Sequence, residues 1–228
     1  MAIAVAKTRR GEASRAAILS AALELFQEKG YEATTMRSIA DRVGVSLGSS
    51  YHYFPTKEHL VLEFYRHTHE LHSAAIAPLL AREKDFASRL RGTIRAVVVT
   101  CEPFHAFAGS IFSTVANPSS PLNPFGGPAK PLRDEVVALY GQVVRGSDAR
   151  IPADIAEMLP LLLWLYQMGI LYFWIFDRSP GRLRTLEVID ETTDLIVRLL
   201  SLANLPLLRG SRRRILGLIK SVAEGQQI

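Results

Sequence analysis

Small, hydroxyl-bearing and aromatic side chains follow one another between Leu47 and Tyr53, in the run LGSSYHY. Serine hydroxyls and an imidazole can hydrogen-bond to base edges in the major groove of DNA, and a leucine can contact a thymine methyl. A glycine near the start of a helix lets backbone amides approach a phosphate. The run holds no arginine or lysine, so bidentate contacts to guanine are not available from it. The pattern predicts DNA reading through serine, histidine, backbone approach and DNA shape.

Two short helices joined by a tight turn are predicted to position this run. Thr35 is a suitable N-cap for a helix that ends near Val43, and Gly44 supplies the positive φ of the turn. The next helix begins at Ser46 and stops before Pro55, because the residue preceding a proline resists helical geometry. The spacing therefore predicts a helix-turn-helix.

Apolar side chains at Ile39, Val43, Val45 and Phe54 are expected to face inward, with the small Ala40 where the helices cross. The outward side of the second helix is then free to enter a major groove. Tyrosine hydroxyls are expected to reach phosphates, and residues on the flanking helices to clamp the DNA backbone. The candidate DNA-binding residues are Thr35, Arg37, Leu47, Gly48, Ser49, Tyr51, His52, Tyr53 and Lys57.

The stretch from Gly30 to Leu60 resembles the signature of the TetR family of bacterial regulators. The residues that carry the resemblance are GYEATTMRSIADRVGVSLGSSYHYFPTKEHL. It implies a homodimer that binds a roughly palindromic operator, as a repressor released by a small ligand. One departure is Ser50, at an inward position that is often leucine or isoleucine in the family. A serine there weakens the packing of the recognition helix unless its hydroxyl bonds back to the carbonyl of Ser46.

Helical periodicity extends over the rest of the chain, and no stretch sustains a period of two. We predict an all-α protein, with a three-helix DNA-binding domain at 1–55 that contains the helix-turn-helix. A larger helical ligand-binding and dimerisation domain follows at 56–208, with a basic tail at 209–228. The segment Asn117–Pro131 holds five prolines and two glycines and is predicted to be irregular. The predicted helices span 14–30, 35–43, 46–54, 56–77, 85–101, 104–116, 131–145, 153–176, 183–203 and 211–223.

Hydrophobic residues make up 48% of the 228 residues and charged residues 21%, which allows a sizeable core. The single cysteine, Cys101, excludes a disulfide framework within the chain, and the first residues lack a signal-peptide pattern. We therefore expect a cytoplasmic protein. The net charge is +5, but five basic residues against one acid lie from Leu205 onward. The expectation of DNA binding thus rests on pattern rather than charge.

A run of eighteen uncharged residues, Leu159–Phe176, is long enough to span a membrane. Pro160, Gln167 and Gly169 lie inside it, and a helix that is apolar all round is otherwise buried all round. The resemblance favours a homodimer through helices near 153–176 and 183–203, without a membrane. The alternative is a membrane-associated protein anchored by 159–176, with a cytosolic DNA-binding head.

Bulky apolar side chains with sparse polar groups predict a cavity for a small, largely apolar effector. For any single member, ordinary core is an equally good interpretation. The candidate ligand-binding residues are Phe104, His105, Phe107, Phe112, Trp164, Gln167, Met168 and Tyr172.

Other reactive residues do not form a recognised pattern. His67, His69 and His72 lack the spacing of a metal signature, so we predict no metal and favour a solvated or cavity-lining face. Cys101 near His105 lacks a third orienting group, so we predict no catalytic residues and no enzyme. No pattern calls for a cofactor. An enzyme or metal-binding domain behind a borrowed DNA-binding head stays as an alternative.

Overall fold

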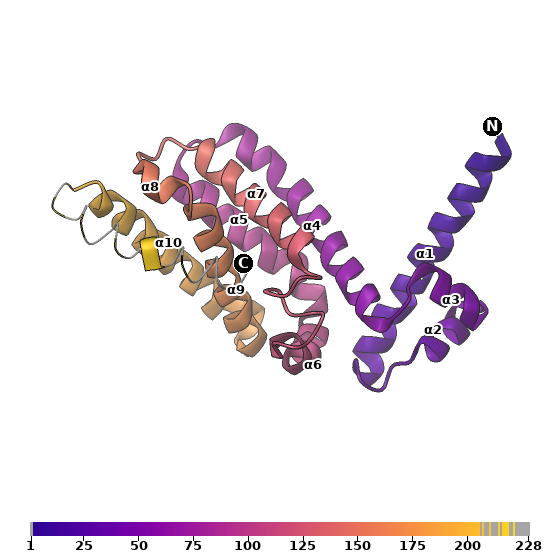
Figure 1. The fold of residues 1–228 in the computed structure, drawn as a ribbon. Helices are drawn as coiled ribbons and strands as arrows, with labels where there is room; N and C mark the ends of the chain where they lie inside the picture. Colours follow the sequence, from indigo (N-terminus) through magenta and orange to yellow (C-terminus); the bar gives the residue numbers. More distant parts are fainter. Residues whose placement is uncertain are drawn as a thin grey trace. The chain divides into compact units, whose positions relative to one another are not determined.

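The structure is a computed structural model that describes residues 2–205, together with 207, 210, 214, 216–218 and 221. All regular elements in this part of the chain are helices (Figure 1). They are α1 (Ala2–Lys29), α2 (Met36–Val43), α3 (Leu47–Tyr53), α4 (Lys57–Arg82), α5 (Phe86–Cys101), α6 (His105–Ala116), α7 (Lys130–Arg145), α8 (Ala153–Ala156), α9 (Leu159–Phe176) and α10 (Leu183–Ala203). Short 3₁₀ turns occupy Glu102–Phe104 and Pro180–Arg182. The all-α prediction is confirmed.

The helices form two compact units that are interleaved along the chain. Unit 1 contains residues 1–67 and 104–129, and unit 2 contains residues 68–103 and 130–228. The helix α4 therefore begins in unit 1 and ends in unit 2. The division of the chain into a DNA-binding domain that ends at residue 55 and a second domain that begins at residue 56 stays a prediction.

Unit 1 is built on an apolar core that α1 shares with α2, α3, α4 and α6. Ile18 and Phe26 of α1, Ile39 of α2 and Leu60 of α4 are buried in this core. α6 contributes Phe107, whose ring stacks on Phe26 with centroids 5.3 Å apart. Because one core joins these helices, the helix-turn-helix rests on α1, α4 and α6 together.

The proline-rich segment belongs to unit 1 and is irregular, as predicted. Its backbone forms successive turns, in which Ser120, Asn123 and Gly126 donate N–H groups to the carbonyls of Asn117, Ser120 and Asn123. The side-chain amide of Asn123 also donates to the carbonyls of Val115 and Asn117, and its oxygen accepts the N–H of Phe125. Leu122 is fully buried in the core, so the segment is tied to the helices of unit 1.

Unit 2 is a layered helical bundle in which α7 packs most extensively against α9, and α10 packs against α5 (Figure 1). Arg91 and Arg95 of α5 form ion pairs with Asp190 of α10, and Arg91 also contacts Asp194. The buried side of α10, which includes Ile189, faces the bundle. These contacts determine which side of α10 faces away from the bundle.

A buried arginine joins two helix ends within unit 2. Arg89 is 1% exposed, and its guanidinium donates to the carbonyls of Leu80 and Glu83 near the end of α4. It also donates to those of Gln142 and Val143 near the end of α7. Helix ends leave carbonyls without intrahelical partners and carry partial negative charge. One side chain therefore satisfies and neutralises both ends.

Most predicted helix boundaries agree with the structure, with three differences. α1 starts at Ala2 instead of Ser14, and α4 continues through Pro78 to Arg82. The single helix predicted at 153–176 is two helices, α8 and α9. Pro160 lies at the start of α9, where its missing N–H has no intrahelical partner to lose. The predicted helix at 211–223 lies largely outside the described residues.

Candidate functional sites

The helix α2 and the following turn have the predicted cap geometry. Thr35 is the N-cap, with its hydroxyl accepting from the N–H of Ser38 and the Ser38 hydroxyl oxygen accepting from the N–H of Thr35, both at 3.1 Å. Gly44 closes the helix with φ +73°, and its N–H is directed at the carbonyls of Ala40 and Asp41. A left-handed residue without a Cβ penalty allows the chain to reverse at once into α3.

The recognition helix α3 presents a mixed polar and aromatic face. Ser46 caps it by accepting the N–H of Ser49 at 3.1 Å. Gly48, Tyr51 and His52 are exposed, and Tyr51 retains 47% of its surface. Leu47 and Ser49 are half-buried. The chemistry expected from the run is therefore available at the surface, and contact of each residue with DNA stays a prediction.

The candidate DNA-binding residues on the helices beside α3 differ in exposure and in their contacts within the protein. Thr35 and Arg37 are exposed. The Lys57 ammonium donates to the Tyr31 carbonyl at 2.8 Å and lies 4.4 Å from the centre of the Tyr31 ring. Lys57 would therefore have to share or leave this contact to bind a phosphate.

Tyr53 is half-buried and turned toward α1, since a Cβ built on Gly11 would lie 3.7 Å from its hydroxyl. It is thus less outward than Tyr51. A phosphate contact through its hydroxyl would have to be made at the edge of α1.

The buried position in α3 lacks the hydrogen bond that would have compensated for a serine. Ser50 is 0% exposed, and its hydroxyl has no hydrogen-bond partner. The carbonyl of Ser46 accepts the backbone N–H of Ser50 at 3.2 Å, not the hydroxyl. The compensating bond to Ser46 is absent, so the buried side of α3 presents a small side chain with an unsatisfied hydroxyl.

Two charged residues that are not among the candidate DNA-binding residues lie near the end of α3. Arg15 of α1 hydrogen-bonds to Glu63 of α4, and its guanidinium lies 5.0 Å from the centre of the Phe54 ring. Arg15 and Glu63 are separated by 48 residues. No local pattern signals a contact of this range.

The candidate ligand-binding residues are divided between the two units. Phe104, His105, Phe107 and Phe112 belong to unit 1, and Trp164, Gln167, Met168 and Tyr172 to unit 2. Phe107 is a core residue, and Phe104 packs edge-on against Phe64 with centroids 4.6 Å apart. His105 and Phe112 are half-buried.

In unit 2, the amide that was expected to face a ligand has a partner within the protein. Trp164 and Gln167 are buried, and the Tyr140 hydroxyl donates to Gln167 Oε1 at 2.7 Å. Met168 is half-buried and Tyr172 is 55% exposed. The Gln167 oxygen therefore does not require an effector to satisfy it.

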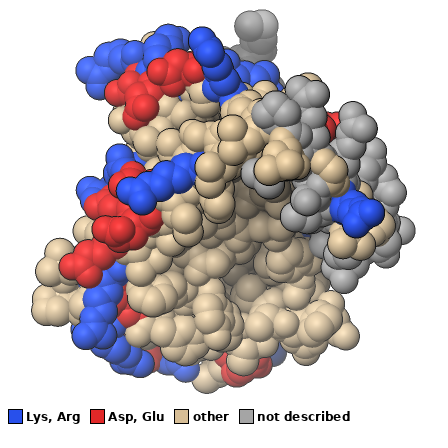
Figure 2. All heavy atoms as spheres, turned by 90° about the vertical axis from the view of Figure 1, so that its left-hand side faces the viewer, with Lys and Arg blue, Asp and Glu red and all other residues tan. Residues whose placement is uncertain are grey.

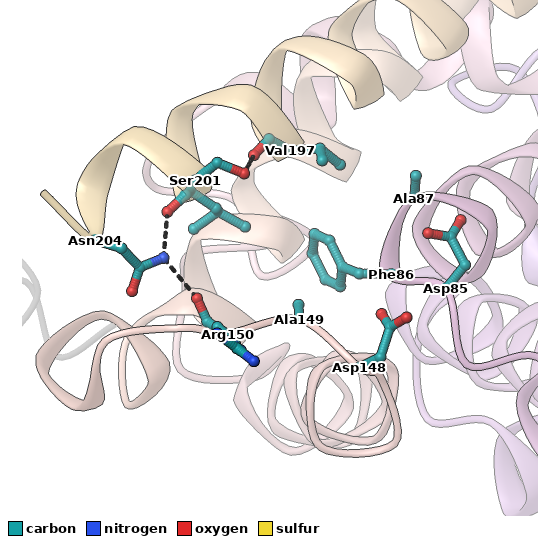
Figure 3. A pocket seen from close by; sticks show the side chains of 10 residues that line it. Asp85, Phe86, Ala87, Asp148, Ala149, Arg150, Val197, Ser201 and Asn204 are labelled. Carbon is teal, nitrogen blue, oxygen red and sulfur yellow. Dashed lines mark hydrogen bonds between the residues drawn. The ribbon is translucent and has the colours of Figure 1, made fainter.

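A hollow of about 510 Å³ opens elsewhere on unit 2, between the start of α5 and the end of α10 (Figure 3). Phe86, Val197 and Leu200 give it apolar walls, and Asp85 and Asp148 lie at one side. None of the eight candidate ligand-binding residues lines it.

The histidines on α4 lie in different environments. His67 is exposed, His69 half-buried and His72 4% exposed. Burial lowers the pKa of His72 to about 4, although a ring nitrogen lies 3.0 Å from the Thr93 carbonyl. Within the described residues, no group of three His, Cys, Asp or Glu side chains could hold a metal ion. Burial also raises the pKa of the Cys101 thiol to about 11, which disfavours the nucleophilic thiolate.

The outer sides of α9 and α10 carry large exposed apolar side chains. Tyr172, Phe173 and Phe176 share one side of α9, and Leu195, Leu199 and Leu202 form a stripe on α10, each at least 39% exposed. Figure 2 looks onto unit 2 from the side of α8 and α10, and shows a broad uncharged surface with charged residues along its margins. Neighbouring exposed apolar side chains are typical of an interaction surface.

The fold and the exposed α3 face define a helix-turn-helix DNA-binding regulator with a second helical unit. The chain belongs to the TetR family. The family model for bacterial regulatory proteins of the tetR family matches residues 18–64, and the tetracyclin repressor-like C-terminal domain model matches residues 89–210. The chain is therefore a transcriptional regulator.

Named relatives and solved structures agree with this assignment. The chain is 31% identical to the transcriptional regulator RutR of Escherichia coli over 69% of this chain and 74% of RutR. It is 35% identical to the repressor KstR2 of Mycobacterium tuberculosis over 43% of this chain and 47% of KstR2. These relatives are regulators of transcription rather than enzymes.

Two solved structures share the fold. A TetR-family regulator from Syntrophomonas wolfei matches with TM-score 0.65 and 22% identity, over 82% of this chain and 95% of that one. The repressor FadR of Thermus thermophilus, solved with lauroyl-CoA, matches with TM-score 0.57 and 21% identity, over 78% and 92%.

The alternative of a membrane-anchored protein is not supported. By length and composition Leu159–Phe176 and Phe86–Ala116 would be able to cross a membrane. Both stretches overlap the part of the chain that matches the family's C-terminal domain. α9 packs against α5, α7, α8 and α10, so the apolar residues on one side of α9 are those of a bundle helix.

Proposed function

We propose that this chain is a cytoplasmic repressor that binds a roughly palindromic operator as a homodimer and is released by a small effector. The observation that carries the proposal is the capped α3, which exposes Gly48, Tyr51 and His52. An α-helix of this kind fits the major groove and reads bases with its outward residues. Two copies would place their helices about 34–36 Å apart, on successive major grooves.

The apolar side of α9 and α10 supports the homodimer. The stripe Leu195, Leu199 and Leu202 recurs at helical spacing on a side of α10 that excludes its buried residues. A symmetric contact between two such faces would cover the same residues on both chains. The two α3 helices would then be related by the twofold axis that a palindromic operator requires.

The effector is proposed to bind in unit 2, close to Trp164, Gln167, Met168 and Tyr172. An effector that binds one arrangement of the units more tightly shifts the population away from the DNA-competent state. The FadR structure supplies lauroyl-CoA as a first probe, whose acyl chain is apolar and whose coenzyme A part is charged.

DNA binding is tested with an operator selected from random duplexes by the full-length chain. The proposal expects sequence-specific binding that weakens as salt rises, because phosphate contacts release counterions. It also expects an apolar effector to weaken this binding without affecting binding to unselected DNA. Failure to enrich any sequence over unselected duplexes would contradict the proposal.

A further inference from the structure

A charged contact links α4 to α1 at the base of the helix-turn-helix. Glu63 of α4 is 9% exposed and accepts a hydrogen bond from Arg15 Nη1 at 2.5 Å. Arg66, one turn along α4, donates to both carboxylate oxygens of Glu63. Burial opposes the charge, but hydrogen bonds from Arg66 and Arg15 outweigh it and lower the pKa of Glu63 to about 2. The carboxylate is therefore ionised at neutral pH.

The same arginine continues the contact to the recognition helix. The Arg15 guanidinium lies 5.0 Å from the centre of the Phe54 ring, within range of a cation–π interaction. Phe54 is 2% exposed and ends α3, where its N–H donates to the Ser50 carbonyl at 2.9 Å. A chain of direct contacts thus runs from Glu63 through Arg15 and Phe54 to the last turn of α3.

Few side chains of α3 itself are buried. Ser50 is its only fully buried residue among Leu47–Tyr53, and the Ser50 hydroxyl has no partner. Leu47 and Tyr53 contact the core while only half-buried. A short helix with so little buried side-chain volume depends on contacts at its ends to hold its direction.

We propose that Glu63 and Arg15 are positioning residues that set the direction of α3 in the major groove, acting through Phe54. The inference rests on the proposed function, since it assumes that α3 reads the operator. Neither residue needs to touch DNA. Their effect is on operator recognition, which demands a fixed α3, more than on binding to unselected DNA, which depends on charge.

The substitution Glu63→Gln is a sharp test, because a positioning role and a purely electrostatic role predict opposite changes in DNA affinity. Removing a negative charge from a DNA-binding head should tighten binding to any DNA. Loss of positioning should instead weaken binding to the selected operator, by about tenfold. The readout is the ratio of operator affinity to affinity for unselected duplex, measured for the full-length chain at fixed salt.

Two control substitutions distinguish loss of the Glu63–Arg15–Phe54 contacts from a general effect on charge or stability. Glu12→Gln removes an exposed acid of α1 one turn before Arg15, and should leave the ratio unchanged. Arg66→Gln removes the other cation on Glu63 while keeping the Arg15–Phe54 contact, and should change the ratio by less than about threefold. Thermal unfolding of each variant reports stability separately.

Phe54→Leu keeps apolar volume in the core but removes the ring beneath Arg15. If the three residues act as one pathway, Phe54→Leu and Glu63→Gln each lower the ratio, and the double variant lowers it no further than the stronger single. Additive effects would overturn the pathway. Unchanged or improved specificity in Glu63→Gln would overturn the proposal while leaving the proposed function intact. A wild-type chain that selects no operator would contradict the proposed function itself, and this inference with it.

Discussion

At the scale of single residues, the recognition helix combines good caps with a poor buried contact. Thr35, Ser46 and Gly44 satisfy helix-end groups in the way their types predict. Ser50 places a hydroxyl in the core without a partner. A buried polar group without a hydrogen bond destabilises the folded state, by about 1–3 kcal/mol.

Replacing Ser50 by alanine is expected to stabilise the protein by about 1 kcal/mol, because the unsatisfied hydroxyl is removed and alanine favours the helix. Urea unfolding measures the change in the free energy of unfolding. Ser49 is only half-buried, so Ser49→Ala serves as the matched control on the same helix and should change stability by less than about 0.5 kcal/mol. A loss of stability in Ser50→Ala would show that the hydroxyl has a favourable partner.

His72 should make stability depend on pH. Its pKa is about 4 in the folded protein, against an ordinary value of 6.5, so the unfolded chain binds the proton first as pH falls. Stability is therefore complete above about pH 6.5 and is lost progressively as pH falls toward 4, by on the order of 3 kcal/mol. The other titratable group acting on it is His69.

This dependence is measured by denaturant unfolding of wild type and His72→Gln at several pH values. Glutamine keeps a donor for the Thr93 carbonyl but does not titrate. The variant should lose most of the slope between pH 6.5 and 4. Equal slopes in the two proteins would place the titration at other residues.

At the scale of elements, the ends of α4 and α7 depend on the single guanidinium of Arg89. Gly146 is required beside it, because an added Cβ would lie 2.3 Å from Arg89 Nη2. Helix caps such as Thr35 and Gly44 can be predicted from the sequence, since the cap and its hydrogen-bond partner lie within a few residues of each other. The contacts of Arg89 and Arg15 cannot, because their partners come from distant segments.

Gly146→Ala is expected to destabilise the protein by about 1–3 kcal/mol, since the methyl displaces the guanidinium from its carbonyls. Gly109→Ala is the matched control: Gly109 is exposed in α6 with nothing within 4 Å of an added Cβ. Alanine there should stabilise by about 0.5–1 kcal/mol. Thermal unfolding of both variants measures these changes. An unchanged stability in Gly146→Ala would mean that the Arg89 guanidinium moves aside at little cost.

The exposed stripe of α10 should control assembly. Leu199→Asp places a charge in the middle of the proposed contact, which would leave it desolvated and unpaired in a dimer. Light scattering is expected to show a monomer, with operator affinity lowered by at least about tenfold. Glu191→Gln, on an exposed position of the same helix, should remain dimeric. A dimeric Leu199→Asp would place the interface on another surface.

At the scale of the whole molecule, the order of helices was predictable but their grouping was not. Helix periods, caps and prolines predicted nine helical segments before residue 205 that lie close to those observed, and the run around Gly44 and Gly48 identified the DNA-binding head. α6 reads as one more helix of the C-terminal domain, yet Phe107 stacks on Phe26 in unit 1. An apolar helix can pack on either unit, because periodicity shows which side is buried and not against what.

The effector site was the least predictable part for the same reason. Gln167 was a sound candidate as a buried amide, and only the fold shows that Tyr140 satisfies its oxygen. Bulky residues such as Phe107 have the composition of a cavity wall and of a core alike.

The central claim is that a homodimer reads a palindromic operator with two α3 helices. It is tested most directly by measuring the affinity and stoichiometry of the full-length chain on its selected operator and on a scrambled duplex of equal length. The account predicts two chains bound to one operator, at half-sites one helical turn apart. It also predicts that the chain binds this operator at least about 10³-fold more tightly than the scrambled duplex. Equal affinity for the two duplexes would contradict it.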